Sequence, residues 1–232
     1  MEFKVDIWSI FDLIAPSCPA CGLAAGRCGS LCAGCEADLP ALRSPCPRCG
    51  LPATGGACTG HHDPAVERTL AACAYAFPVD ALVQQLKFGG RLPLARPLGR
   101  LLANAVRRDA RPGAAGPLPA ALLPVPLHPS RERQRGFNQA EAIARAAATE
   151  LRIPLLAGAV HRRRDTPAQS GLDLAARRRN LQGAFTVSEP LPAHIALVDD
   201  VITTGSTMAA LASVLQAHGV RRVDAWAVAR TL

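Results

Sequence analysis

Apolar residues along this chain of 232 residues form two kinds of pattern. Short continuous apolar runs, typical of buried strands, occupy residues 71–77, 121–126, 155–161, 195–198 and 223–229. Between them, apolar positions recur at helical spacing over residues 79–87, 92–108, 139–151 and 206–218. Strands that alternate with helices predict an α/β fold with a mostly parallel sheet and helices on both faces. Because right-handed crossovers keep successive strands close, the last strand is expected next to the strand at 195–198.

The first quarter of the chain has a different pattern. Residues 5–14 predict a short helix, with Ile7, Ile10, Phe11 and Ile14 on its apolar face. The stretch that follows is rich in Gly and Pro and holds eight of the nine cysteines between Cys18 and Cys58. A segment with so little periodicity cannot bury a core of its own and needs cross-links, such as a bound metal ion or disulfides. We therefore expect a small N-terminal domain at residues 1–62 and an α/β domain at residues 63–232.

The cysteines of this segment recur in pairs with two residues between them. This spacing lets one turn direct both donors at a single ion, and two such turns complete a tetrahedron. We predict two structural zinc sites, with ligands Cys18, Cys21, Cys32 and Cys35 in the first and Cys46, Cys49, Cys58 and His61 in the second. Two alternatives stay open, because neighbouring turns could interleave and His62 could replace His61. Cys28 is an unpaired extra, and Cys73 is expected in a buried strand.

Charge and composition narrow the setting of the protein. The net charge is +8, and nearly all of the positive charge is Arg, because Lys occurs only at Lys4 and Lys87. This Arg excess favours partners that carry phosphate, and nucleic acid could be one of them. A genomic bias toward Arg explains the Arg excess equally well. Membrane insertion is not expected, because no apolar run has the length of a membrane span. Asp6 and Asp12 interrupt the N-terminus where a signal sequence would be unbroken, so we expect a soluble cytoplasmic protein, in which disulfides are disfavoured.

The most informative segment follows the apolar run at residues 195–198. Two acids, Asp199 and Asp200, are expected at the carboxyl end of a buried strand, where open α/β sheets bind ligands. A hydroxyl-rich turn and a helix come next, and the helix directs its first N–H groups into that turn. Carboxylates repel phosphate but suit sugar hydroxyls or Mg²⁺. The segment therefore predicts a phosphosugar site; the alternative is a strand followed by ordinary helix capping. A P-loop ATPase is disfavoured, because no G-x-x-x-x-G-K-[ST] string occurs.

Residues 198–207, Val-Asp-Asp-Val-Ile-Thr-Thr-Gly-Ser-Thr, resemble the phosphoribosyl pyrophosphate (PRPP) loop of type I phosphoribosyltransferases. The resemblance implies a phosphoribosyltransferase-like fold in which the paired acids bind the ribose hydroxyls and the turn binds the 5′-phosphate, with Mg²⁺ as cofactor. The implied PRPP-binding residues are Asp199, Asp200, Val201, Thr203, Thr204, Gly205, Ser206 and Thr207.

A cysteine-rich double zinc ribbon before such a domain is similar to the layout of the ComF family. Three further blocks resemble that family: Leu86–Arg91 with its K-F-x-G pattern, Arg131–Ala140 with R-G-F-N-Q, and Thr166–Leu172. One departure is His61, because the last zinc position is usually Cys in the family. The resemblance implies transfer of a phosphoribosyl group to an acceptor that the sequence does not identify. It also implies a link to DNA uptake in natural competence, with single-stranded DNA and a helicase-type competence protein as partners.

Within these blocks we expect the groups that bind pyrophosphate and close the site. A loop after the strand at 121–126 carries Arg131, Arg133 and Arg135, whose guanidinium forks match phosphate oxygens. A solvated basic loop is the plain alternative. Asn138 is expected to line the cleft or to cap the following helix, and Lys87 belongs to the same group. Residues 166–172 suit a mobile flap with Gln169 and Ser170 over the substrate. The expected catalytic residues are Asp199, Asp200 and Arg135.

Two functions from different classes remain open. The first is a phosphoribosyltransferase, and the second is a non-catalytic accessory protein that binds single-stranded DNA and uses PRPP or phosphate as a regulator. A ribbon that binds DNA is expected to carry stacking aromatic residues, yet residues 18–62 contain none. The arginines gather instead at residues 162–164 and 177–179, beside the proposed flap. A phosphorylated substrate, a DNA backbone or solvent could face them there.

Overall fold

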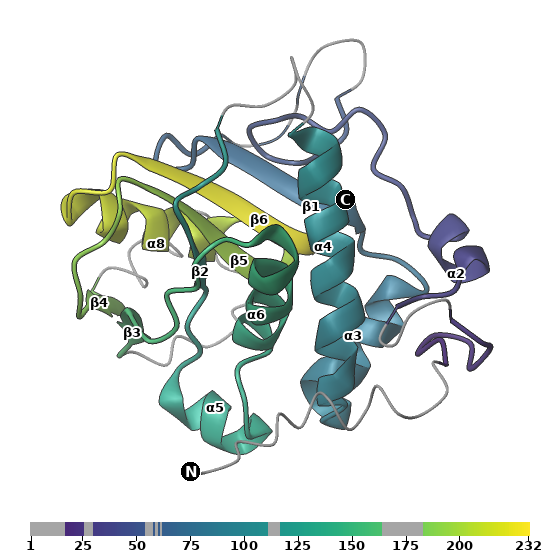
Figure 1. Ribbon diagram of the computed structural model, residues 1–232. Coiled ribbons are helices and arrows are strands. Elements are labelled where there is room, and N and C mark those ends of the chain that lie inside the picture. The colour runs from purple at the N-terminus through teal and green to yellow at the C-terminus, as the bar shows by residue number, and fades with distance from the viewer. Residues whose placement is uncertain are drawn as a thin grey trace.

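The central element of the protein is a four-stranded parallel sheet with strand order β1-β6-β5-β2 (Figure 1). Its strands are β1 (Arg68–Ala74), β2 (Ala121–Pro124), β5 (His194–Ile202) and β6 (Arg222–Arg230). The computed structural model describes residues 17–25, 30–53, 58, 60, 62–110, 117–163 and 183–232. β5 and β6 are the inner strands, as their almost continuous burial requires. As predicted, the last strand lies beside the strand that carries the two acids.

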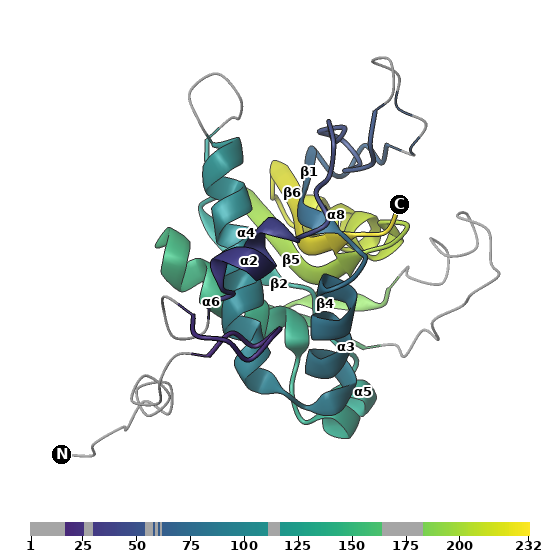
Figure 2. The same ribbon diagram turned by 90° about the vertical axis from the view of Figure 1, so that its right-hand side faces the viewer.

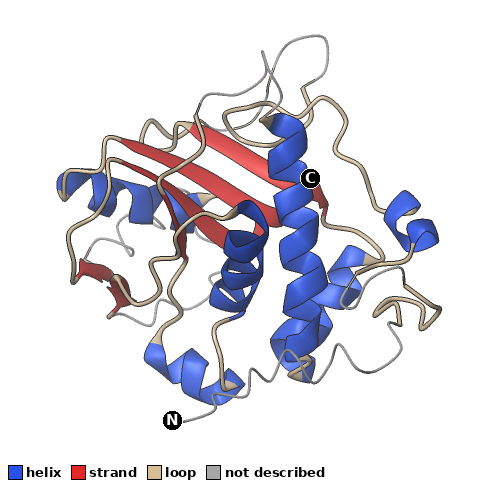
Figure 3. Ribbon diagram, viewed as in Figure 1, coloured by secondary structure: helices blue, strands red, loops and turns tan. Residues whose placement is uncertain are grey.

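Helices cover both faces of the sheet (Figures 1 and 3). One face packs against α4 (Ala95–Asp109) and α6 (Gln139–Leu151), with α3 (Val79–Gly89) at their side. The other face packs against α8 (Ser206–Ala217), which Figure 2 shows on the opposite side of the sheet from α4. Shorter elements are α2 (Ala33–Ala37), the 3-10 turn η1 (Leu92–Leu94) and α5 (Pro129–Arg135). These layers confirm the predicted fold class.

The two helices of the first layer approach each other closely at Gly99. A Cβ atom at this position would lie 2.5 Å from the Cβ of Ala146 and 2.7 Å from the carbonyl oxygen of Ile143. Both distances are shorter than van der Waals contact, so the α4–α6 packing depends on the absent side chain. Around this contact, Leu98, Leu102 and Ile143 are fully buried.

The structure corrects three expectations about secondary structure. Residues 155–161 do not form a strand of the central sheet: Leu155 makes one isolated bridge to Leu122. The nearby β3 (Val160–Arg162) pairs antiparallel with β4 (Phe185–Val187) in a separate two-stranded sheet. The expected arginine loop after β2 contains the helix α5, and β1 begins three residues earlier than expected. The predicted helix at residues 5–14 lies outside the described residues.

Candidate functional site

The carboxyl end of β5 holds the two predicted acids in the last part of the strand. Each carboxylate accepts the N–H of the next residue, at 2.8 Å from Asp200 N to Asp199 Oδ1 and 2.8 Å from Val201 N to Asp200 Oδ1. These bonds fix both side chains against the backbone of the strand end. Asp200 is buried, and Asp199 is mostly enclosed by protein but keeps some contact with solvent.

Lys87, near the end of α3, forms an ion pair with Asp200. Its Nζ lies 2.6 Å from Asp200 Oδ2, and both side chains are largely shielded from solvent. The K-F-x-G segment and the Asp-Asp segment, which are more than a hundred residues apart, therefore meet in one site. The sequence motifs marked both partners, but their direct contact emerges only from the fold.

Asp199 has a different electrostatic environment from its neighbour. Burial and the adjacent Asp200 carboxylate raise the pKa of Asp199 well above its usual range, although Lys87 acts in the opposite direction. Two carboxyl groups in sequence are thus held unequally, since Asp200 has its counter-ion and Asp199 has none at contact distance among the described residues. A ligand that donates hydroxyl hydrogens or brings a cation would relieve the repulsion between them.

The predicted phosphate turn follows the strand directly and leads into α8. Gly205 is the N-cap of this helix and has φ +79, a conformation that favours glycine. The turn orders its own hydroxyls: Thr204 Oγ1 lies 2.9 Å from Ser206 Oγ, and the N–H of Ser206 donates to Thr204 Oγ1 at 3.4 Å. Thr203 and Thr204 are exposed, and Gly205, Ser206 and Thr207 are partly exposed. The first N–H groups of a helix of 12 residues thus face an accessible turn, as an anion site requires.

A small pocket of about 40 Å³ adjoins this turn on the side of the cysteine-rich segment. Its charged lining consists of Arg48, Asp63 and Arg230, together with Thr204, Gly205 and Ser206 from the turn. Its volume suits water or a small ion rather than a nucleotide. Arg48 and Arg230 were not predicted as site residues, although the position of Arg230 at the end of the apolar run of β6 was a visible signal.

The helical form of α5 separates the three predicted arginines. Arg131 and Arg135 are four residues apart and share a face, whereas Arg133 lies on another face and is exposed. The predicted loop is thus a helix, and the binding of pyrophosphate by its arginines stays a prediction. The guanidinium of Arg135 lies over the ring of Phe88 at 5.1 Å from its centroid and donates to Gln139 Oε1 at 3.1 Å. Arg135 is therefore next to the helix α3 that carries Lys87.

Asn138 has a structural role in this arrangement. Its side-chain oxygen accepts the N–H of Ala140 at 3.0 Å, which makes it the N-cap of α6. Its amide also donates to the carbonyl of Val125 at 3.0 Å. Both polar groups of this buried side chain are thus used within the fold. The predicted flap residues Gln169 and Ser170 lie outside the described residues.

Two groups of metal-type donors form among the described residues. The first contains Cys18, Cys21, Cys32 and Cys35, and the second contains Cys46, Cys49, Cys58 and His62. Within each group all ligand atoms lie within 4.8 Å of one another. The pairing is sequential, as predicted. The fourth donor of the second group is His62, the alternative that the sequence left open, whereas His61 and Cys28 lie outside the described residues.

The geometry of both groups fits tetrahedral zinc. A zinc ion with four thiolates at about 2.3 Å separates neighbouring sulfur atoms by about 3.8 Å. The sulfur atoms of Cys21 and Cys32 are 3.6 Å apart, those of Cys49 and Cys58 are 3.2 Å apart, and Cys46 Sγ lies 3.4 Å from His62 Nε2. Four protein donors would leave no ligand position for water, so a zinc ion held by either group would be structural.

Two of the thiols have lowered pKa values. Burial opposes the ionised form of Cys18, but the backbone groups of Cys32, Cys21 and Ala20 outweigh it and lower the pKa of Cys18 to about 6. In the same way, the backbone groups of Arg48 and Cys49 outweigh burial and lower the pKa of Cys46 to about 7. Cys73 behaves differently: it is buried in β1, and burial raises its pKa to about 12. Among the metal-type donors the shifts differ in sign, since burial and the neighbouring thiols of Cys58 and Cys46 raise the pKa of Cys49 to about 11. The position of Cys73 in a buried strand is as predicted.

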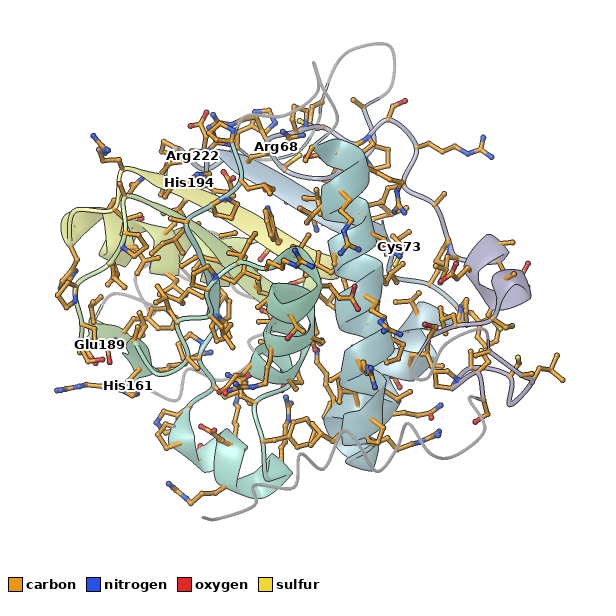
Figure 4. All side chains as sticks on the ribbon, viewed as in Figure 1. Arg68, Cys73, His161, Glu189, His194 and Arg222 are labelled. Atoms are coloured by element: carbon orange, nitrogen blue, oxygen red, sulfur yellow. The ribbon has the colours of Figure 1, made fainter. Side chains whose placement is uncertain are left out.

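A second charged cluster lies at the opposite end of the sheet from the two acids, where the strands begin. Figure 4 shows His194, Arg222 and Arg68 at this end. Buried Asp224 lies 3.0 Å from His194 Nε2 and accepts from Arg222 Nε at 3.2 Å, while Arg68 pairs with Asp109. These contacts join β5, β6, β1 and α4 and lie away from the phosphate turn, so we regard them as stabilising the fold.

The similarity to known proteins extends over almost the whole chain. It is 37% identical to the DNA utilization protein YhgH of Escherichia coli (strain K12) over 216 residues, which are 90% of this chain and 94% of that protein. The identity to Competence protein F of Haemophilus influenzae is 35% over 209 residues, 86% and 90% of the two chains. The chain belongs to the ComF family.

A shorter match of 32% over 107 residues connects this ComF-family chain to Competence protein ComFC of Streptococcus pneumoniae, at 46% of each chain. No protein-family model matches the chain. A separate finding concerns the membrane: among the described residues, no helix has the length and apolarity that crossing a bilayer requires.

Proposed function

We propose that this ComF-family protein binds PRPP with Mg²⁺ at the β5–α8 turn and transfers its phosphoribosyl group to an acceptor. The observation that carries the proposal is the order of groups at the end of β5. Two carboxylates, one of them paired with Lys87, precede a glycine-capped turn onto the N-terminus of a long helix. One face of this arrangement suits hydroxyl donors and the other suits an anion, which matches a phosphorylated sugar.

Each group then has a role in binding. Asp199 and Asp200 accept hydrogen bonds from the ribose hydroxyls, and the N–H groups and hydroxyls of residues 203–207 hold the 5′-phosphate. Lys87 places a positive charge beside Asp200, on the side where we expect pyrophosphate. Mg²⁺, which the hard carboxylate oxygens suit, neutralises charge on the phosphate groups when it is bound.

The proposed reaction is a displacement at the anomeric carbon. A lone pair of the acceptor forms the new bond as the carbon–oxygen bond to pyrophosphate breaks, and pyrophosphate leaves with that electron pair. The acceptor's proton passes to solvent. The protein contributes orientation and charge: the acids fix the ribose, the turn fixes the phosphate, and Lys87 and Arg135 are the cations we assign to the leaving group.

Pyrophosphate release from PRPP tests this activity. Purified protein with Mg²⁺ is screened against nucleobases, ammonia sources and single-stranded DNA, and released pyrophosphate is measured with a coupled assay. We expect release with one acceptor class, abolished by Asp199→Asn with Asp200→Asn and retained by Glu189→Gln, an exposed acid beyond β4. Wild-type protein that binds PRPP but releases no pyrophosphate with any acceptor contradicts the transferase role and leaves a binding role.

A role in DNA uptake is the second part of the proposal, because relatives carry the names Competence protein F and DNA utilization protein. The observation that favours it is Phe88, which is 74% exposed beside the site with Arg135 over its ring. An exposed aromatic ring with an adjacent cation is the element on which single-stranded bases stack. A helicase-type competence protein is the partner we expect to deliver such a strand.

The DNA proposal is tested with a matched pair of exposed phenylalanines, Phe88 in α3 and Phe77 just before it. Phe77, just before α3, is 79% exposed but lies far from Arg135 along the helix. We expect Phe88→Ala to weaken single-stranded DNA binding by about 1–3 kcal/mol, as measured by fluorescence anisotropy at several salt concentrations. Phe77→Ala should leave the affinity within about twofold. Equal losses in both variants, or no DNA binding at low salt, would reject the second role.

A further inference from the structure

Arg230, the last residue of β6, connects the second metal group to the phosphate turn. It is 5% exposed. Its Nε donates to the carbonyl of Cys49 at 2.9 Å, and its Nη1 donates to the carbonyl of Ile202 at 3.0 Å and also to that of Thr203. A single planar guanidinium thus bonds a metal-ligand residue on one side and the strand-to-turn backbone on the other.

The segment between Cys46 and Cys49 is fixed to the sheet at three consecutive carbonyls. Pro47 O accepts from the N–H of Thr69 at 2.8 Å, Arg48 O accepts from the Thr69 hydroxyl at 2.8 Å, and Cys49 O accepts from Arg230. Gly50 has φ +72 and passes close to this contact, because a Cβ there would lie 3.2 Å from Thr69 and 3.6 Å from Arg230. The metal turn is therefore built onto the edge of the α/β domain.

The bonds to Ile202 and Thr203 orient the groups that would meet a phosphate. In a planar trans peptide the carbonyl oxygen and the following N–H point in opposite directions. The carbonyl of Ile202 also accepts the N–H of Thr231 at 3.0 Å, whereas Arg230 is the partner that holds the carbonyl of Thr203. With both carbonyls held inward, the N–H groups of Thr203 and Thr204 point away from Arg230. Thr203 and Thr204 are the exposed residues of the turn, so the fixed carbonyls set the direction of its donors.

The charge of Arg230 is also matched to the metal group rather than to a carboxylate. The acceptors that Arg230 reaches within the described residues are all backbone carbonyls, those of Cys49, Ile202, Thr203 and Thr231. A buried cation requires nearby negative charge. A zinc site with three thiolates and one histidine carries a net negative charge, and its ligand Cys49 is the residue that Arg230 contacts.

We propose that Arg230 is a positioning residue that couples metal binding at Cys46, Cys49, Cys58 and His62 to ligand binding at the phosphate turn. The metal fixes the Cys46–Cys49 turn, Arg230 transmits this constraint, and the turn presents its N–H groups in the binding geometry. This inference rests on the proposed binding of PRPP. Coupling between two sites is reciprocal, so PRPP must also stabilise the metal.

The first test compares two arginines at opposite ends of β6. Arg230→Lys retains the charge but cannot bond both sides with one fork, and Arg222→Lys is the matched control at the strand beginning. We expect Arg230→Lys to raise the Kd for PRPP by about tenfold or more, as measured by calorimetry, because bonds that orient the donors are lost. Arg222→Lys should leave the Kd unchanged. Equal Kd values for wild type and Arg230→Lys overturn the inference.

The second test measures zinc release to a chromogenic chelator. Saturating PRPP should slow release of one of the two zinc ions by about fivefold or more in the wild type. Arg230→Lys should abolish this effect, and Cys58→Ser should lack the PRPP-sensitive phase, which assigns it to the second site. A wild type that binds PRPP but releases zinc at the same rate contradicts the coupling alone. A wild type that does not bind PRPP contradicts the proposed function itself.

Discussion

Asp199 and Asp200 show how two identical side chains receive different roles from their surroundings. Asp200 is buried against the ammonium group of Lys87, whereas burial and the neighbouring Asp200 carboxylate raise the pKa of Asp199. A carboxyl group whose pKa is raised by its environment is common in functional sites. The strand pattern and the motif predicted both acids as site residues. They did not predict that only Asp200 has a counter-ion, since Lys87 reaches Asp200 only after α3 folds against the strand end.

This inequality predicts a pH-dependent stability. The pKa of Asp199 is raised in the folded state, so its cost is absent at low pH, where the carboxyl is protonated in both states, and develops as pH rises from the unfolded pKa to the folded pKa. We expect ligand-free Asp199→Asn to match the wild type in thermal unfolding near pH 4 (about the unfolded pKa) and to exceed it increasingly toward pH 8. Asn keeps the oxygen that accepts the Asp200 N–H.

Thermal unfolding scans between these pH values check this prediction, with Glu189→Gln as the control for loss of a charge. A variant that is less stable than the wild type over the whole range would show that Asp199 stabilises the fold, contrary to the account.

Helices and strands were predicted from sequence to the extent that their cores follow a local period. β2, β5, β6, α6 and α8 each have a run of apolar residues that their own spacing identifies, and they form close to the expected positions. α5 was missed because Pro129–Arg135 has no apolar period; the helix begins with His128 as its N-cap and Pro129 in its first turn. Residues 155–161 were misassigned because a short apolar run does not reveal which strand it pairs with.

The α4–α6 contact predicts an unusual effect of a helix-favouring substitution. Gly99→Ala should destabilise the protein by about 1–3 kcal/mol, because the added methyl group overlaps α6. Gly89→Ala in α3 is the matched control, since its methyl group meets only Gln85 at 3.9 Å and should be neutral or stabilising. Urea unfolding measures both. A Gly99→Ala protein as stable as Gly89→Ala would contradict the close packing of the two helices.

The N-terminus of α6 separates a structural role from a binding role. Asn138→Ala removes the cap and the bond to Val125, so we expect a loss of about 1–2 kcal/mol in unfolding free energy with an unchanged Kd for PRPP. Asn104→Ala, on the exposed side of α4, should have little effect on stability. Lost PRPP affinity in a folded Asn138→Ala protein would show that Asn138 contributes to ligand binding.

At the scale of the whole molecule, the cysteine-rich segment and the α/β domain form one connected structure. Spacing alone predicted the ligand pairs, because each pair occupies one local turn. It did not choose between His61 and His62, and it did not reveal Arg230, whose contacts join residues 49, 202 and 203. Contacts between such distant segments depend on the packing of the sheet and cannot be read from a local pattern.

The metal count tests the ligand set of the second group. Elemental analysis of purified protein should find about two zinc ions per chain, since each closed group of four donors holds one ion. His62→Ala should reduce the value to about one and lower the unfolding temperature, because structural zinc contributes folding free energy. His61→Ala should keep both ions. The reverse result for the two histidines would contradict the ligand set of the structure.

The measurement that addresses the central claim most directly is calorimetric titration of PRPP into the protein in the presence and absence of Mg²⁺. We predict saturable binding at one site per chain that is stronger with Mg²⁺, and that is lost in the folded Asp199→Asn, Asp200→Asn double variant. Wild-type protein with both zinc sites filled that shows no binding of PRPP would contradict the account of the β5–α8 turn as a phosphoribosyl site.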